Sequence, residues 1–266
     1  MTDINIVVVY NNETLLEQMK DSIISKDASG SLSYEVIALD NTRGRFKSAA
    51  EAYNYALDNL CGAKCVVFCH QDIIFKEHSL QDIYDICSVN DRTLIGAAGV
   101  MNNRHNGWNA GATISAMSEG KDGIKKYDSL SKGTTREVFT LDECLIAAHR
   151  ELFDEVRFDP VVCDGWHLYA VDLCLQCHLK GIRVLVYDAN IIHLSGGNLN
   201  KSFYACESKL ARKYRRDYKE ICYTCGWTYT NPILLVLLRW DKRFRIRHKC
   251  RRLIYRATRL FSRNTE

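Results

Sequence analysis

The sequence predicts an α/β protein with a mostly parallel, doubly wound central sheet, and two observations favour this fold class. Apolar runs at residues 4–10, 33–41 and 64–69 alternate with segments of helical spacing, and the connections are short. The first run, INIVVVY, has the near-continuous apolar pattern of a parallel strand covered on both faces. Strands and helices that alternate in this way form right-handed crossovers.

The first half is expected to contain three helices, at residues 13–24, 45–60 and 79–88, the second with small alanines on its inner face. Each strand ends in polar residues, namely Asn11, then Asp40 and Asn41, then the triplet HQD at 70–72. Ligands in doubly wound sheets bind at the carboxyl ends of the strands. These three clusters therefore predict one binding site.

The second half continues the pattern less regularly. We expect a strand rich in small residues at 93–100, a mobile active-site loop at 102–112, and a strand or turn followed by a short helix at 141–160. A polar-aromatic loop then runs into a helix over 163–181 that stops at Gly181, and a strand pair over 182–197 includes His193.

Composition indicates a globular protein in a reducing compartment. The hydrophobic fraction is 47% and the charged fraction 26%. The start lacks the pattern of a secretory signal, and the run 233–238 is far shorter than the ~20 residues that cross a bilayer. The 12 cysteines are expected to be reduced and buried. Structural zinc is not expected, because the pairs Cys174/Cys177 and Cys222/Cys225 would have to converge.

Charge is distributed unevenly. Residues 239–263 hold eleven Lys or Arg against one Asp, a net of +10, whereas the rest of the chain has a net of −6. This basic segment points to an anionic surface as partner. Neither GxGxxG nor GxxxxGK[ST] is present. The phosphates of a nucleotide would therefore need another counter-charge, for which a divalent cation held by carboxylate and imidazole is the natural candidate.

The chain resembles the GT-A glycosyltransferases, specifically the inverting family 2 that uses nucleotide-diphospho-sugars. The resemblance covers roughly residues 4–200. It rests on five segments in order: VVVYNN, LDN, RFKSAAEAYN, HQD and VDLCLQCHLKGIRVLVYDANIIHLSGG. It implies a GT-A catalytic domain over 1–200, with a nucleotide-sugar half at about 1–100 and an acceptor half at about 101–200.

The resemblance also implies a metal site for Mn²⁺ or Mg²⁺. HQD stands where the family has Asp-x-Asp, so Asp72 takes the role of metal ligand, and His193 matches a further ligand after the last core strand. His70 either ligates the metal or hydrogen-bonds sugar or phosphate. The alternatives are that His70 and His193 are core imidazoles and that Asp72 caps a helix or a turn.

The nucleotide side follows by position in the family. Val9, Tyr10 and Asn11 resemble the lip that receives base and ribose, and Asp40 resembles the acid that bonds the base. Asn41, Lys47, His70, Gln71 and Asp72 complete the predicted nucleotide-sugar contacts. Asp40 is alternatively a turn residue, and Lys47 a solvated charge.

Inversion needs a carboxylate base that deprotonates the acceptor hydroxyl. Many family members carry Glu-Asp-x-Asp before the helix, but this chain has YAVD at 169–172, so Ala170 replaces the base. Asp164 and Asp172 are the substitutes, with Asp142 and Glu143 less favoured, and Asp172 is equally a helix N-cap. Trp166 and His167 are predicted acceptor contacts, although Trp166 fits the core equally well.

Residues 201–266 are expected to form a helical, basic segment that includes an amphipathic helix at 209–221. Residues 227–266 combine aromatic, aliphatic and basic side chains, a mixture typical of peripheral binding to an anionic membrane. The alternative is packing on the domain or on a second subunit, as in a homodimer. Nucleic acid is not an expected partner, because no reader motif is present.

The resulting expectation is a metal-dependent glycosyltransferase, cytoplasmic and peripheral at the inner membrane face. It would move a sugar with inversion from a UDP-sugar or another nucleotide-diphospho-sugar to a glycan or lipid-linked glycan. A metal-dependent phosphohydrolase is the rival enzyme, although it would need more clustered carboxylates. A nucleotide-sugar-binding pseudoenzyme is the second rival, suggested by Ala170.

Overall fold

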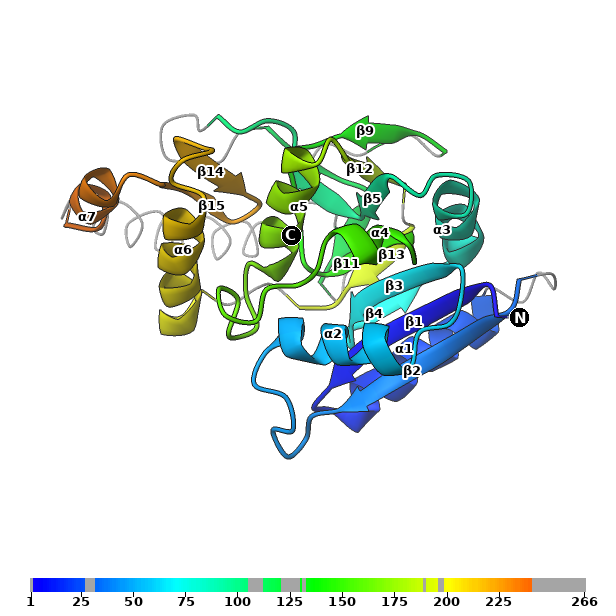
Figure 1. Cartoon of the computed structure of the whole chain (residues 1–266). Helices are drawn as coiled ribbons and strands as arrows, with labels where there is room; N and C mark the ends of the chain where they lie inside the picture. Colours follow the sequence, from blue (N-terminus) through cyan, green and yellow to red (C-terminus); the bar gives the residue numbers. More distant parts are fainter. Residues whose placement is uncertain are drawn as a thin grey trace, which may run out of the picture.

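The structure is a computed structural model that describes residues 2–26, 32–104, 112–120, 130, 133–188, 190–195 and 199–240. Its centre is a seven-stranded sheet in the order β2-β1-β3-β11-β5-β12-β9 (Figure 1). The strands are β1 (Ile4–Tyr10), β2 (Tyr34–Asp40), β3 (Cys65–His70), β5 (Thr93–Gly96), β9 (Thr135–Glu137), β11 (Leu145–His149) and β12 (Arg183–Tyr187).

The sheet is mixed in direction. β1 pairs in parallel with both β2 and β3, and β5 with β12, as the alternating strands and helices predict. β11 lies antiparallel between β3 and β5, and β9 is antiparallel to β12. A fully buried strand is apolar on both faces whichever way it runs, so the sequence pattern does not reveal the direction of β11.

Three smaller sheets complete the strands. One has the order β10-β6-β7, formed by Thr140–Leu141, Ala98–Val100 and Thr113–Ser115. Another has the order β4-β13-β8, formed by Ile73–Phe75, Ile191–His193 and Met117–Glu119. The third is the hairpin of β14 (Glu220–Tyr223) and β15 (Gly226–Tyr229).

The predicted strand at 93–100 is two strands, because β5 joins the central sheet and β6 leaves it to pair with β10. Small residues permit this change of partner. A side chain at Gly99 would meet the carbonyl oxygen of Thr140 on the adjacent strand. The sequence feature was therefore informative, although it marks a switch between sheets.

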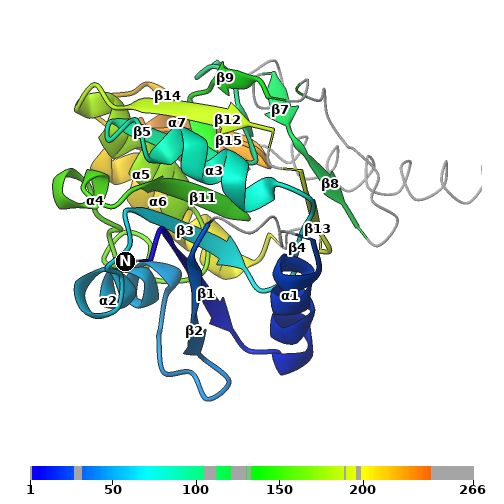
Figure 2. The same ribbon diagram turned by 90° about the vertical axis from the view of Figure 1, so that its right-hand side faces the viewer.

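Helices cover both faces of the central sheet (Figure 2). On one face lie α1 (Glu13–Lys26) and α3 (Ser79–Cys87), and on the other α2 (Ala49–Asn59), α4 (Leu152–Glu155), α5 (Tyr169–Leu179) and α6 (Lys201–Lys213). β1 contributes side chains to the cores on both faces of the sheet, because successive side chains of a strand point to opposite faces. Ile6 and Val8 join the α1 and α3 core, whereas Val7 joins the α2 and α5 core.

The helix ends have local causes. α2 begins four residues later than predicted, at Ala49, because the Ser48 side chain accepts a hydrogen bond from the Glu51 N–H and caps the helix. α5 ends at Leu179, and Gly181 has φ +67°, the left-handed conformation that follows many helices. The predicted stop at Gly181 is therefore confirmed.

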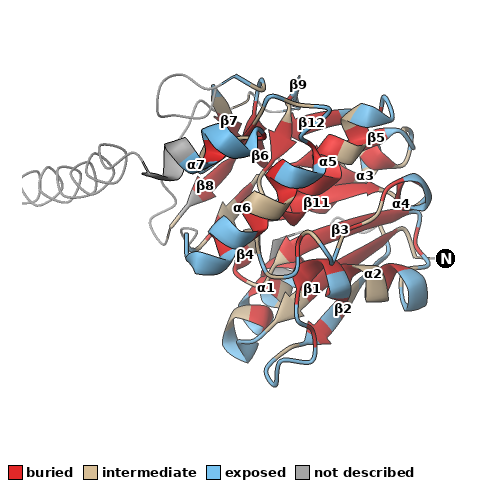
Figure 3. Cartoon of the chain, turned by 60° about the vertical axis from the view of Figure 1, so that its left-hand side comes forward, coloured by how far each residue is buried: buried red, intermediate tan, exposed pale blue. Residues whose placement is uncertain are grey.

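The C-terminal segment, predicted to be helical, is helical only in part among the residues that the structure describes. α6 begins at Lys201, capped by Asn200, and ends at Lys213, whereas residues 220–229 form a hairpin before α7 (Pro232–Trp240). α6 also joins the core that contains α2 and α5. Figure 3 shows the buried central strands and the exposed outer helix faces.

Parts of three predictions lie outside the described residues: loop residues 105–111, residues 189 and 196–197 of the strand pair, and the basic segment beyond Trp240. No helix among the described residues is both long enough and apolar enough to cross a bilayer.

Candidate active site

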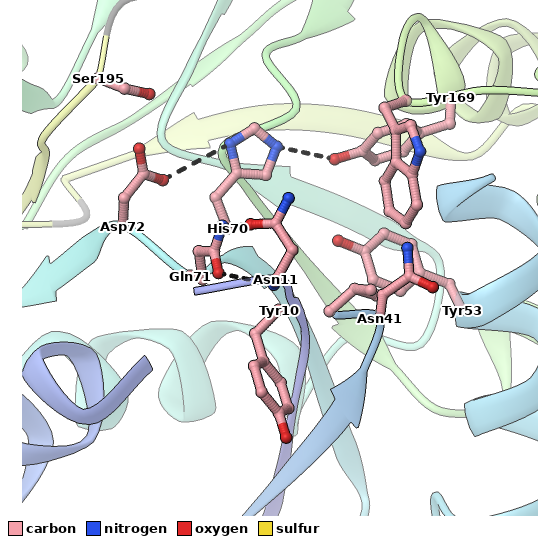
Figure 4. A pocket seen from close by; sticks show the side chains of 11 residues that line it. Tyr10, Asn11, Asn41, Tyr53, His70, Gln71, Asp72, Tyr169 and Ser195 are labelled. Carbon is pink, nitrogen blue, oxygen red and sulfur yellow. Dashed lines mark hydrogen bonds and ion pairs between the residues drawn. The ribbon is translucent and has the colours of Figure 1, made fainter. Parts of the chain in front are cut away.

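A cavity of about 330 Å³ opens at the carboxyl ends of β1 and β3 (Figure 4). Eight of the residues that line it are predicted site residues: Val9, Tyr10, Asn11, Asn41, His70, Gln71, Asp72 and Trp166. Tyr53, Tyr169 and Ser195 also line it and were not predicted. The strand ends thus do converge on a single hollow.

The register of β1 with β2 and β3 brings the residues at the ends of these three strands together. Val9 lies opposite His70 in the β1–β3 ladder, and Tyr10 lies opposite Asp40 in the β1–β2 ladder. The Gln71 side chain then hydrogen-bonds the residues that directly follow β1. Its Oε1 accepts hydrogen bonds from the N–H groups of Asn11 and Asn12, each at 3.0 Å, and its Nε2 donates to Asn11 Oδ1 at 2.8 Å.

His193 reaches the same place from the second half of the chain. β13 pairs with β4 so that His193 lies opposite Ile73, next to Asp72. The N–H of Leu194 donates to the Asp72 carbonyl at 3.0 Å, which ties the two segments together. A hydrogen-bonded strand pair therefore fixes the imidazole beside the carboxylate.

His70, Asp72 and His193 form a three-residue cluster. Asp72 Oδ1 lies 3.4 Å from His193 Nε2 and 4.0 Å from His70 Nδ1, and the two nitrogens are 3.4 Å apart. In an octahedral shell with bonds of about 2.1 Å, adjacent ligand atoms lie about 3 Å apart and opposite ones about 4 Å apart. The three atoms therefore fit a shared divalent cation, and imidazole and carboxylate are ligands that Mn²⁺ accepts.

The electrostatics favour an ionised Asp72 and a neutral His70. Burial disfavours the Asp72 carboxylate, but hydrogen bonds and charge from His193, with Ser195, outweigh it and lower the pKa of Asp72. Desolvation in the cavity, reinforced by His193, lowers the pKa of His70 to about 4. An ionised carboxylate thus faces a neutral His70 imidazole.

The Tyr169 hydroxyl contacts the His70 ring at Nε2, the nitrogen that faces away from Asp72. His70 Nε2 lies 3.0 Å from the Tyr169 hydroxyl, which donates to the Glu143 carbonyl at 3.0 Å. Strand alternation places His70 on the same face as Phe68, which packs on Tyr53, and the Tyr53 ring packs on Tyr169. No sequence pattern pointed to this contact, because a tyrosine on a helix face is equally typical of the core.

Two predicted nucleotide contacts lie outside the cavity wall of the described structure. The Asp40 side chain is exposed and accepts a hydrogen bond from the Thr42 N–H at 2.8 Å, which lowers the pKa of Asp40. Lys47 is exposed too, and its N–H donates to the Glu51 carboxylate. Both positions match the alternatives of a turn residue and a solvated charge.

Asp172 is buried in α5 and faces α6 instead of the cavity. Its carboxylate accepts from Lys213 Nζ at 2.6 Å, from the Tyr214 hydroxyl at 3.0 Å and from Gln176 at 2.7 Å. The N-cap of α5 is Leu168, so the N-cap alternative for Asp172 is wrong. The structure therefore gives Asp172 the place of a core ion pair.

The other predicted acceptor-side residues lie on the loop before α5. Asp164 is exposed and forms an ion pair with Lys209 at 2.6 Å. It lies two residues before Trp166, which is part of the cavity wall. His167 is half-buried, and its ring packs edge-on against Phe203. Of this loop, only Trp166 lines the cavity in the described structure.

Asp142 and Glu143 connect the site to the C-terminal hairpin. Asp142 accepts hydrogen bonds from the Cys144 N–H and from the Thr224 hydroxyl in the β14–β15 turn. Burial and the neighbouring Asp142 charge raise the pKa of Glu143 well above its ordinary value, against the opposing effect of backbone N–H groups at the start of α5. Burial thus favours the protonated form of Glu143.

The cysteines that the structure describes play no part in this cluster. Cys174 and Cys177 are buried in α5, and Cys222 is buried in the hairpin. Among the described residues, His70, Asp72 and His193 are the one group of His, Cys, Asp or Glu whose ligand atoms converge enough to hold a metal ion.

Solved structures share this architecture. GalNAc-T7, whose structure contains UDP, GalNAc and Mn²⁺, is similar with a TM-score of 0.55 and 13% identity, over 80% of this chain and 48% of that one. S. aureus TarS is similar with a TM-score of 0.53 and 15% identity, over 82% and 40%. This chain thus spans less than half the length of these two. The fold is that of the GT-A glycosyltransferases.

The sequence matches the glycosyltransferase-like family over residues 5–222. The chain belongs to this family, which is a family of transferases. A curated relative, the ATP synthase subunits region ORF 6 of Fuscovulum blasticum, is 25% identical over 190 residues, covering 68% of this chain and 72% of the relative.

Proposed function

We propose that the protein is a metal-dependent glycosyltransferase that moves a sugar, with inversion, from a UDP-sugar to a glycan or lipid-linked glycan. The observation that carries this proposal is the convergence of His70, Asp72 and His193 at the edge of the strand-end cavity. Two similar structures hold matching ligands, since GalNAc-T7 contains UDP, GalNAc and Mn²⁺ and TarS 1–349 contains UDP-GlcNAc.

Each part of the cavity has a proposed task. Val9, Tyr10 and Asn41 form the wall for base and ribose, and the Gln71 side chain holds the end of β1 in place. Asp72 and His193, with His70, would hold Mn²⁺ or Mg²⁺. When bound, the cation supplies charge neutralisation for the diphosphate leaving group. Trp166, 41% exposed, offers a ring face for a sugar.

For the base we propose Asp164 in preference to Asp172. Asp164 reaches solvent beside the Trp166 wall, whereas Asp172 is fully buried against Lys213. A base must meet the acceptor hydroxyl within hydrogen-bond reach, which the buried carboxylate does not. If Asp164 is the base, Asp164→Asn abolishes turnover and leaves donor binding intact. Retained turnover in Asp164→Asn removes it from this role.

The rivals are less consistent with the site. A metal-dependent phosphohydrolase would use several clustered carboxylates, but the cluster contains one, Asp72. A pseudoenzyme was suggested by Ala170, yet Ala170 is completely buried in the core, so that position does not face the cavity. A non-catalytic binder would bind the donor without transfer or hydrolysis, which turnover assays separate from an enzyme.

A peripheral membrane position is the second part of the proposal. α7 exposes Ile233, Leu234 and Val236, with Ile233 69% exposed, and it lies beyond α6 and the hairpin (Figure 1). Arg212 and Arg215 of the α6 end line a separate cavity of about 290 Å³ beside α7. Apolar and basic groups side by side are typical of surfaces that bind anionic bilayers.

The test is calorimetric titration with UDP-, GDP- and TDP-sugars, with Mn²⁺ or with EDTA. We expect one UDP-sugar to bind far more tightly with Mn²⁺ present, and Asp72→Asn to lose that dependence while keeping its melting temperature. As the control, Asp85→Asn changes an exposed carboxylate on α3 that bonds Gln81, and should behave as wild type. Metal-independent binding, unchanged in Asp72→Asn, would refute the proposal.

A further inference from the structure

We propose that Tyr169 is a positioning residue that locks His70 in the Nε2–H tautomer, so that the Nδ1 lone pair faces Asp72 and His193 as a third metal ligand. This inference rests on the proposed metal-dependent function of the same site. It assigns a role to His70, for which the sequence left ligation and hydrogen bonding to the donor open.

The argument is a count of protons. A tyrosine hydroxyl has one proton to donate and two lone pairs that accept, whereas a carbonyl oxygen can only accept. The Tyr169 hydroxyl lies 3.0 Å from the Glu143 carbonyl oxygen, so its proton is used there. The second contact of this hydroxyl, His70 Nε2 at 3.0 Å, must then be the donor. A neutral imidazole with its proton on Nε2 has a lone pair on Nδ1.

The Nδ1 lone pair of His70 faces the other two residues of the cluster. His70 Nδ1 lies 3.4 Å from His193 Nε2 and 4.0 Å from Asp72 Oδ1, on the opposite side of the ring from Tyr169 (Figure 4). Metal-binding histidines usually donate their other ring N–H to a fixed acceptor, which sets the tautomer and the ring orientation. Here the acceptor is a phenol hydroxyl, in place of the more usual carboxylate or carbonyl.

The hydroxyl is held firmly enough for this task. The Tyr169 side chain is buried in the first turn of α5, and its ring packs against Tyr53 and Phe158. The Tyr53 hydroxyl also hydrogen-bonds that of Tyr169. A close-packed aromatic ring cannot swing away without opening the core. Tyr169 therefore couples α5 and the Glu143 backbone to the metal site.

The first test measures the tautomer without metal. In protein carrying ¹⁵N-histidine, with His70 assigned by its loss in His70→Gln, the ¹⁵N shifts distinguish a protonated Nε2 from a protonated Nδ1. We expect the Nε2–H form in wild type and a mixture of tautomers in Tyr169→Phe. Tyr214→Phe is the matched control, because it removes a hydroxyl bonded to Asp172 in the same core. The Nδ1–H form in wild type would overturn the inference, as would an unchanged tautomer in Tyr169→Phe.

The second test measures Mn²⁺ affinity by electron paramagnetic resonance. Loss of an outer partner of a metal-bound histidine costs about 10- to 100-fold in affinity, and we expect that loss in Tyr169→Phe but not in Tyr214→Phe. Equal losses in both would indicate a merely structural effect and overturn the positioning role. If wild type shows the predicted tautomer and binds no Mn²⁺, the metal-dependent function fails while the tautomer lock stands.

Discussion

Gln71 shows how a single side chain can organise a binding wall. It is exposed to the cavity between His70 and Asp72, yet its own contacts all go to the end of β1. It holds the N–H groups of Asn11 and Asn12 in one direction and thereby shapes the lip on which the nucleotide is proposed to lie.

We therefore expect Gln71→Ala to weaken donor binding without unfolding the protein. A net hydrogen bond contributes about 1 kcal/mol, so losing part of this network should raise the dissociation constant for the UDP-sugar roughly 5- to 10-fold. Gln81→Ala is the matched control, because Gln81 on α3 bonds Asp85 far from the cavity. Equal donor affinity in Gln71→Ala and wild type would remove Gln71 from the site.

The sequence indicated candidate site residues where polar residues interrupt apolar strands, and the structure places His70 and Asp72 together in one cavity wall. His70 and Asp72 were identifiable because a buried strand does not otherwise end in an imidazole and a carboxylate. Tyr53 and Tyr169 were not identifiable, because an aromatic residue on a helix face is equally typical of the core, and both are in fact buried. Their contribution depends on hydroxyl contacts, which only the three-dimensional structure reveals.

At the scale of elements, the contact between α5 and α6 depends on a buried ion pair. Lys213 on α6 lies 2.6 Å from Asp172, which is 1% exposed at its side chain. Lys209, four residues earlier on α6, lies the same 2.6 Å from Asp164, but that carboxylate is 55% exposed. The two pairs have the same atom types and spacing, and they differ in burial.

We predict that Lys213→Met lowers the free energy of unfolding by roughly 2–4 kcal/mol, because it leaves a buried carboxylate unpaired. Lys209→Met should lower it by less than about 1 kcal/mol, since exposed pairs contribute little. Urea denaturation of both variants measures the difference. Equal effects would mean that Asp172 is not held in the buried position described.

The Asp172–Lys213 pair should also make the free energy of unfolding depend on pH. Burial raises the pKa of Asp172, and Lys213 opposes that effect, so removing Lys213 should raise the pKa further. A raised native pKa means that the folded state loses stability as pH rises above the unfolded value of about 3.9. The deficit of Lys213→Met relative to wild type should therefore grow from pH 4 towards neutrality. A deficit independent of pH would contradict this reasoning.

The sequence predicted the secondary structure of the first half of the chain better than that of the C-terminal part. The strands β1, β2 and β3 and the helices α1, α2 and α3 followed from periodicity, because each helix buries one face and each strand ends in polar residues, whereas β4 was not predicted. The hairpin at 220–229 was mistaken for helix, since its alternation is short and it follows a basic, amphipathic helix directly. Its place is set by distant contacts, such as that of Asn103 Nδ2 with the Glu220 carbonyl oxygen at 2.6 Å, which no local pattern encodes.

At the scale of the whole molecule, the proposed donor site and the proposed membrane surface lie on different elements. The donor site is built at the strand ends of the central sheet, whereas α7 and the end of α6 lie at the edge of the molecule (Figure 1). Residues 227–229 belong to β15, so a membrane test should leave the hairpin intact.

We predict that the chain ending at Thr230 no longer sediments with vesicles containing anionic phospholipid. Since each basic residue near the surface contributes about 1 kcal/mol, replacing Arg212 and Arg215 with Gln should weaken binding roughly 10- to 30-fold. The control is Arg183→Gln, which removes an exposed arginine on β12. Undiminished vesicle binding by the shortened chain would exclude α7 and the basic segment as the membrane contact.

The central claim is that a divalent cation joins His70, Asp72 and His193 to the diphosphate of a nucleotide-sugar. The most direct measurement is anomalous diffraction from crystals grown with Mn²⁺ and UDP. The account predicts a manganese peak within about 2.3 Å of His70 Nδ1, Asp72 Oδ1 and His193 Nε2, with UDP in the cavity between Val9 and Asn41. UDP bound there without a manganese peak at the three residues, or manganese at other residues, would contradict it.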